Sequence, residues 1–126
     1  YILPGIGEEG LARRILDGAK NKERIAVKSM GIRDLKVCLS RASAVVSNDT
    51  GPRHISVALS VPTVVLLGPM DERYTWYPSS CTYPMYKEVP CRPCNKKRCS
   101  EDHACLKGIM PDDVFKKLEE VFERRS

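Results

Sequence analysis

Short apolar runs alternate along the chain with segments whose hydrophobic residues recur every three or four positions. The apolar runs cover residues 1–3, 24–27, 44–47 and 62–68. The segments with three-and-four spacing cover residues 11–18, 32–42 and 55–59. Runs of the first kind predict strands, and segments of the second kind predict amphipathic helices. The last apolar run is apolar on both faces, which is typical of a buried parallel strand.

Strands separated by helices of this length predict βαβ units, in which helices cover a parallel sheet. We therefore expect an α/β fold built as one domain over residues 1–126, with ligands bound outside the carboxyl ends of the strands. Residues 69–90 show no clear period and predict irregular structure packed by aromatic side chains. A final helix should begin at Pro111, because Asp112 and Asp113 follow it in the first turn.

The composition is that of a soluble globular protein. Apolar residues make up 42% of the 126 residues and charged residues 29%, and no apolar run approaches the roughly 20 residues that a membrane span needs. The formal net charge of +5 is spread along most of the chain, so we expect no nucleic-acid partner. Trp76 and the nearby tyrosines are expected to pack together rather than to stack on bases. Because the chain starts at Tyr1 in an apolar segment, we expect it to be a piece of a longer one.

A polar loop follows the third apolar run and precedes a predicted helix, where an α/β sheet binds ligands. Asp49 or Thr50 can cap the helix, and Gly51 lets a ligand approach the backbone closely. Amides at a helix N-terminus favour an anion, and Arg53 and His54 can add side-chain donors. The loop thus predicts a site for the phosphates of a nucleotide. A well-capped helix, with His54 bonded to neighbouring backbone, explains the same residues.

Three glycines after the first apolar run, Gly5, Gly7 and Gly10, match a dinucleotide-binding fingerprint in letters. The match is weak, because Glu8 and Glu9 stand at the helix start, where a pyrophosphate would sit. A carboxylate at this position can accept hydrogen bonds from ribose hydroxyls or stabilise the helix N-terminus. The residues alone leave both roles open.

Four of the six cysteines crowd into a short, basic loop within residues 81–108. They are Cys91, Cys94, Cys99 and Cys105. Four thiols at such spacings can close a tetrahedral zinc site, with His103 available as a substitute ligand. Two disulfides, or reduced cysteines that pack the loop, explain the same pattern. A zinc ion here would be structural, because four protein ligands leave no open position for catalysis. Cys38 falls on an apolar helical face and is expected in the core.

The polar loop and the strand after it closely resemble the donor half of the lipopolysaccharide heptosyltransferases. The matching letters are Ser47-Asn48-Asp49-Thr50-Gly51-Pro52-x-His54, then Ala58-Leu59-x-Val61-Pro62-Thr63-Val64-x-Leu66-x-Gly68-Pro69. The cysteine segment and the last helix are also similar to a stretch of many members, so the resemblance covers nearly the whole chain. It implies a GT-B glycosyltransferase, with two Rossmann-like domains facing across a cleft. This chain would be part of the C-terminal, nucleotide-sugar-binding domain, truncated at its start.

The resemblance implies ADP-heptose as the sugar donor and no cofactor for the chemistry. Asp49 would contact hydroxyls of the donor sugar. The amides around Thr50 and Gly51 and the ring of His54 would hold the diphosphate. The implied reaction is a direct displacement at the anomeric carbon, in which the loop stabilises the charge that develops on the departing nucleoside diphosphate.

Two further residues follow from the same resemblance. Glu8 falls where the family places a carboxylate that binds the ribose of the nucleotide, and Met30 falls near the position that packs on the base. The family's acceptor domain, which supplies the catalytic base, is not present in these residues. We therefore expect no catalytic residue in this fragment and no transfer by the fragment alone.

The whole enzyme is expected to transfer heptose, or a related sugar, to the lipopolysaccharide core. It would act in the cytoplasm of a bacterium, at most peripheral to the inner membrane. The competing hypothesis is a non-catalytic α/β module that binds a nucleotide or phosphate. Selectivity for a nucleoside diphosphate over a monophosphate distinguishes the two.

Overall fold

The computed structural model describes residues 1–75, 79–96 and 98–124. They divide into two compact units, Tyr1–Val37 and Cys38–Ser126. Each unit has its own internal contacts, whereas the sequence predicts one domain. Trp76, the centre of the predicted aromatic packing, lies outside the described residues, and Tyr74 beside it is 77% exposed.

The first unit contains two short helices, α1 (Glu9–Gly18) and the 3-10 helix η1 (Lys22–Arg24). Its two apolar runs, predicted as strands, meet only in a single parallel bridge between Ile2 and Val27. Helix α2 (Ile32–Ser40) begins in this unit and ends in the second. The predicted helices are therefore confirmed, whereas the predicted strands are reduced to one pair of residues.

The apolar face predicted for α1 is only partly buried. Ala12 is buried, but Leu11 and Ile15 are each about half exposed. In α2, Leu39 is buried, while Cys38, predicted as a core residue, is intermediate. Periodicity therefore located these helices correctly but overstated how far their apolar side chains are covered.

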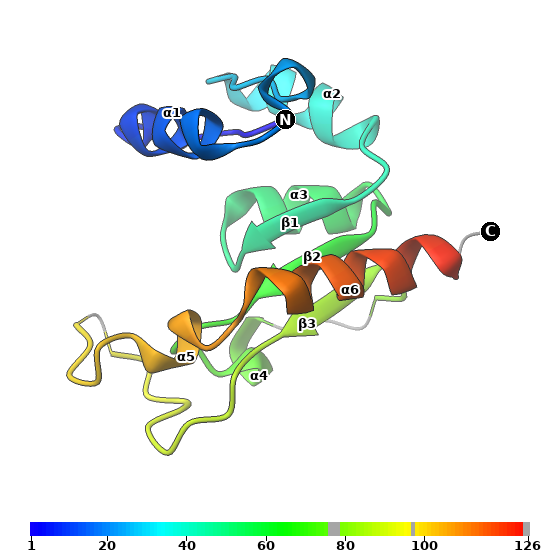
Figure 1. Ribbon diagram of the computed structural model, residues 1–126. Coiled ribbons are helices and arrows are strands. Elements are labelled where there is room, and N and C mark those ends of the chain that lie inside the picture. The colour runs from blue at the N-terminus through cyan, green and yellow to red at the C-terminus, as the bar shows by residue number, and fades with distance from the viewer. Residues whose placement is uncertain (76–78, 97, 125–126) are drawn as a thin grey trace. The chain divides into compact units, whose positions relative to one another are not determined.

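The second unit is built on a three-stranded parallel sheet (Figure 1). The strands are β1 (Val45–Asn48), β2 (Thr63–Leu66) and β3 (Thr82–Met85), in the spatial order β1-β2-β3. Val45 aligns with Thr63, and Thr63 aligns in turn with Thr82. All three strands end at the same edge of the sheet, so segments that follow them start from this edge.

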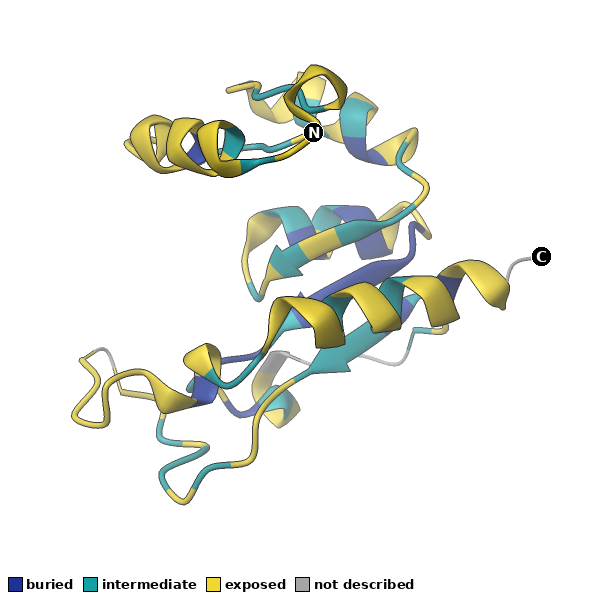
Figure 2. Ribbon diagram, viewed as in Figure 1, coloured by how far each residue is buried: buried dark blue, intermediate teal, exposed yellow. Residues whose placement is uncertain are grey.

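Helices cover both faces of this sheet. Helix α3 (Gly51–Ala58) contacts β1 and β2, and α6 (Pro111–Glu123) contacts β2 from the opposite face (Figure 1). Val64 and Val65 point to opposite faces and are both fully buried, and Figure 2 shows most of β2 as buried. The prediction of a parallel strand buried on both faces is confirmed, and so is the helix that starts at Pro111.

Strand β3 lies in the stretch where irregular structure is predicted, and this prediction is wrong for these four residues. Thr63 and Leu67 donate their amides to the carbonyls of Cys81 and Met85. Backbone N and C=O groups of successive residues point to opposite sides of a strand. The backbone nitrogen of Pro84 therefore points away from β2, to the outer side of β3. Proline lacks an N–H and is tolerated at such an edge, which explains how a strand can carry a sequence that reads as a loop.

The cysteine-rich segment leaves β3 and returns to the carboxyl end of β2. The Arg92 Nε donates to the Gly68 carbonyl at 3.2 Å, and the amides of Cys94 and Asn95 donate to the Pro69 carbonyl at 3.1 and 3.0 Å. The only helices in this part of the unit are the short α4 (Glu72–Thr75) and α5 (Ala104–Lys107), among the residues described. No helix within the described ranges is both long and apolar enough to span a membrane.

Candidate nucleotide-binding site

The polar loop of residues 47–54 connects the carboxyl end of β1 to the first turn of α3. Thr50 is the N-cap residue of α3, with extended backbone (φ −140°, ψ −178°). Its amide and its hydroxyl both donate to the Asn48 carbonyl, at 2.8 and 3.4 Å. Its side chain therefore folds back on the loop and makes no cap hydrogen bond to α3. Of the two residues predicted as possible caps, Thr50 takes the N-cap position without a side-chain hydrogen bond to the helix.

The backbone at Gly51 is the open part of this helix start. Pro52 has no N–H, and the Arg53 amide donates to the Thr50 carbonyl at 3.1 Å. The Gly51 amide donates no hydrogen bond to any of the described residues. A Cβ placed on Gly51 would meet no heavy atom within 4 Å. Gly51 is exposed, so a ligand can approach the backbone at this residue.

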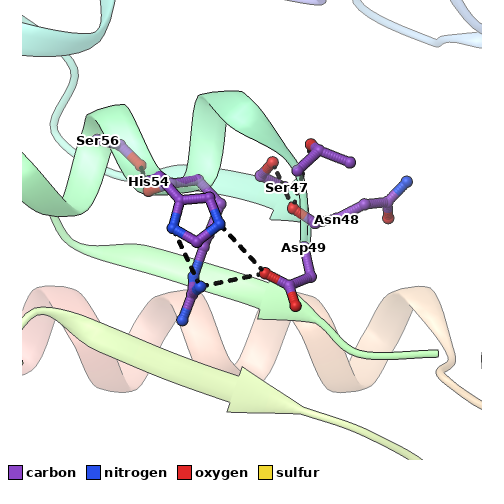
Figure 3. Close-up of polar contacts among 7 residues, drawn as sticks. Ser47, Asn48, Asp49, His54 and Ser56 are labelled. Carbon is purple, nitrogen blue, oxygen red and sulfur yellow. Dashed lines mark hydrogen bonds and ion pairs between the residues drawn. The ribbon is translucent and has the colours of Figure 1, made fainter. Parts of the chain in front are cut away.

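A buried ion pair fixes the loop to the helix (Figure 3). The Arg53 Nη1 lies 3.1 Å from the Asp49 Oδ1, with side chains 1% and 7% exposed. Arg53, which the sequence suggests as a possible side-chain donor to a ligand, directs its Nη1 to Asp49 inside the unit. The spacing of four residues between opposite charges at a helix start is the signal that could have revealed the pair.

His54 stands beside this pair with its ring 46% exposed. The ring Nδ1 lies 3.4 Å from the Arg53 Nη1, and the Nε2 lies 3.8 Å from the Asp49 Oδ1 (Figure 3). Because a guanidinium can only donate, we assign the Nδ1 as the acceptor. The proton of the neutral ring is then on Nε2, where it can donate a hydrogen bond.

A buried pair of hydroxyls holds the far side of α3 against the sheet. The Ser56 Oγ donates to the Arg53 carbonyl at 2.9 Å and lies 2.8 Å from the Thr63 Oγ1. The Thr63 Oγ1 in turn donates to the Val61 carbonyl at 2.8 Å. These contacts attach the first turns of α3 to β2, so the loop at the front of the helix has a fixed support.

The two outlying predicted residues, Glu8 and Met30, belong to the first unit. Glu8 is the N-cap residue of α1, and its Oε2 accepts a hydrogen bond from the Gly5 amide at 2.8 Å. The following Gly7 has a φ of +83°, which glycine adopts without strain. Met30 is half-buried. The carboxylate of Glu8 thus shapes the glycine turn, and contacts of both residues with a nucleotide stay predictions.

The four clustered cysteines line one cavity of about 120 Å³, together with His103. All six cysteines of the chain are free thiols. Among the described residues, no three ligand side chains are close enough to hold a metal ion as they stand. The structure therefore brings these thiols to one cavity without assembling either a disulfide or a closed metal site.

Comparison with known proteins identifies the family of this chain. Residues 4–105 match the family described as "Glycosyltransferase family 9 (heptosyltransferase)". Lipooligosaccharide heptosyltransferase 2 of Campylobacter jejuni subsp. jejuni serotype O:6 is 27% identical over 124 residues, which are 93% of this chain and 39% of the relative. Lipopolysaccharide heptosyltransferase 1 of Pseudomonas aeruginosa is 31% identical over 93 residues, which are 74% of this chain and 26% of the relative.

The fold has a solved counterpart in the crystal structure of the glycosyl transferase family 9 from Veillonella parvula. The TM-score is 0.76, with 18% sequence identity, over 97% of this chain and 36% of that one. The chain spans less than two fifths of the length of the relatives named here, 39% at most. Because the family match extends over residues 4–105, which include the polar loop and most of the sheet unit, this protein belongs to glycosyltransferase family 9.

Proposed function

We propose that this chain is the donor-binding part of a heptosyltransferase and that the loop of residues 47–54 binds the diphosphate of the nucleotide sugar. The observation that carries the proposal is the open Gly51 amide at the start of α3, beside the exposed ring of His54. A helix N-terminus carries a partial positive charge and unsatisfied amides, which suit a phosphate oxygen. The loop also lies at the carboxyl edge of a parallel sheet, where such ligands bind.

Each polar group of the loop has a distinct role in this proposal. The Gly51 amide and the His54 Nε2–H donate to the phosphate oxygens, and the Thr50 hydroxyl joins them by giving up its long bond to Asn48. Arg53 is a positioning residue, because its side chain is buried against Asp49. The ion pair neutralises the Asp49 carboxylate, which would otherwise repel a diphosphate.

Asp49 is proposed to contact a hydroxyl of the donor sugar. Its Oδ1 accepts a hydrogen bond from the Arg53 Nη1. A carboxylate has lone pairs for more than one donor, so a sugar hydroxyl can donate to the same group. Glu8 and Met30, which belong to the first unit, are proposed to contact the ribose and the base of a nucleotide.

The sugar donor is proposed to be ADP-heptose and the acceptor the lipopolysaccharide core, at the cytoplasmic side of a bacterial inner membrane. The names of the relatives, a lipooligosaccharide and a lipopolysaccharide heptosyltransferase, support heptose as the sugar and lipopolysaccharide as the acceptor. The amides and the His54 ring would stabilise the negative charge that grows on the departing ADP, so the loop contributes to the rate as well as to affinity. The chemistry proposed for the loop requires no cofactor.

Calorimetric titration of the full-length enzyme tests the proposal. ADP and ADP-heptose should bind, and AMP should bind at least about tenfold more weakly, a loss of about 1.4 kcal/mol for the second phosphate. His54→Ala should weaken ADP binding, whereas His103→Ala, which alters the other histidine of the chain, should leave it unchanged. Equal affinity for ADP and AMP would favour a general phosphate-binding module instead, and no binding of any nucleotide would refute the site.

A further inference from the structure

Four cysteines of the cysteine-rich segment line one cavity, although they are separated along the chain. Cys91 and Cys94 come from the turn after β3, Cys99 from the exposed bend beyond it, and Cys105 from α5. All four line the same cavity of about 120 Å³. The other two cysteines of the chain, Cys38 and Cys81, do not line it. The cavity therefore gathers one specific set of four thiols.

Backbone amides contact one of these sulfur atoms. The Cys99 Sγ accepts hydrogen bonds from the amides of Glu101 and His103, at 3.3 and 3.1 Å. These bonds hold the Cys99 sulfur in the bend of the segment. Arg92 and Lys96 line the same cavity. Thiolates, and not thiols, are the form in which cysteine binds metals.

The cysteine-rich segment has a small buried core and few hydrogen bonds to the sheet. Among its described residues from 86 to 110, Cys105 alone is buried, and α5 is only four residues long. Its anchors on the sheet are the hydrogen bonds of Arg92, Cys94 and Asn95 at the end of β2. A segment with so small a core gains most from a cross-link or a metal ion.

We propose that Cys91, Cys94, Cys99 and Cys105 bind one Zn²⁺ ion in a tetrahedral site. The described side chains do not stand at metal-binding distances from one another, so the four sulfur atoms must move towards one another when the ion binds. Each thiol that binds loses its proton, so four protons are released when the four ligands come together. Four thiolates and Zn²⁺ leave a net charge of −2, which Arg92 and Lys96 on the cavity wall offset.

Zinc content and metal substitution test the site. The full chain, purified under reducing conditions without added zinc, should contain one zinc per chain by elemental analysis. Replacing the zinc with Co²⁺ should give the visible absorption of tetrahedral thiolate coordination. Cys99→Ser should lose most of the metal, while Cys81→Ser and Cys38→Ser, which alter the two cysteines outside the cavity, should keep it. His103→Ala should also keep it, and loss of metal in that variant would overturn the four-cysteine ligand set.

Thiol labelling gives a readout that does not depend on variants that may fail to fold. With zinc bound, alkylation followed by mass spectrometry should modify Cys38 and Cys81 before the four cavity cysteines. A chelator should then make Cys91, Cys94, Cys99 and Cys105 reactive together. Zinc well below one per chain, combined with two disulfides among these four cysteines, would overturn the proposal, as would independent labelling of the four thiols in protein saturated with zinc.

Discussion

The Arg53 Nη1 lies 3.1 Å from the Asp49 Oδ1, and the two side chains are 1% and 7% exposed. This pair ties the loop after β1 to the first turn of α3 and gives His54 a fixed neighbour on its Nδ1 side. A buried charge that has lost its partner is far more costly than an exposed one. The pair is therefore the point at which the architecture of the loop is most easily broken.

Arg53→Met should lower the free energy of unfolding by about 3–5 kcal/mol, because Asp49 is left charged and buried. Urea unfolding of the full chain measures this change. Arg33→Met, at an exposed position of α2, is the matched control and should change stability by no more than about 0.5 kcal/mol. If Arg53→Met behaves like the control, the pair does not hold the loop.

Gly51→Ala should separate ligand binding from folding. A Cβ at Gly51 meets no heavy atom of the protein within 4 Å, so stability should be unchanged or raised by about 0.5 kcal/mol. The same methyl group should stand in the path of a phosphate at the Gly51 amide and weaken ADP binding by about tenfold, or ~1.4 kcal/mol. Calorimetry against Gly10→Ala, an equally open glycine in α1, provides the comparison. Full ADP affinity in Gly51→Ala would place the diphosphate elsewhere.

Thr63→Val and Thr82→Val should have different effects on stability, although the two threonines are aligned in adjacent strands. The Thr63 Oγ1 donates to the Val61 carbonyl and lies 2.8 Å from the Ser56 Oγ, so its loss leaves the Val61 carbonyl without this donor, at a cost of about 1–3 kcal/mol. The Thr82 Oγ1 is buried and has no hydrogen-bond partner among the residues described. Its removal should therefore be neutral or stabilising. Thermal unfolding of both variants checks the contrast, and equal losses would contradict it.

The segment after β2 should contribute a pH-dependent stability through Asp71. The Arg73 side chain and its amide donate hydrogen bonds to Asp71 and lower the pKa of the Asp71 carboxyl from 3.8 to about 2. Since this pKa is lower in the folded state, the contribution is complete above about pH 4 and is lost as the pH falls towards about 2.

Asp71→Asn should remove this contribution. The difference in unfolding midpoint between wild type and variant should be largest near pH 6 and should vanish near pH 2. Added salt should reduce it, because the Arg73 side chain is 83% exposed. A difference that stays constant across this pH range would show that Asp71 acts through its shape and not through its charge.

The local pattern of apolar and polar residues predicted the elements whose apolar residues are consecutive or regularly spaced. Strand β2 and the start of α6 at Pro111 were readable because their signals lie within a few neighbouring residues. The junction of β1 and α3 was readable for the same reason, and the family match confirms the resemblance drawn from it. Strand β3 was missed because its four residues include Pro84 and pair only with a strand sixteen or more residues away.

The sequence by itself determined the α/β alternation, the position of the polar loop and the family, since each depends on the order of residues along the chain. Only the tertiary structure decided that the pair of Arg53 and Asp49 is buried, that Gly51 lies beside open space and that four cysteines line one cavity. The physical reason is that burial and charge pairing depend on which elements come to lie against one another. That arrangement is produced by packing across the whole sheet and is not encoded in any single stretch of residues.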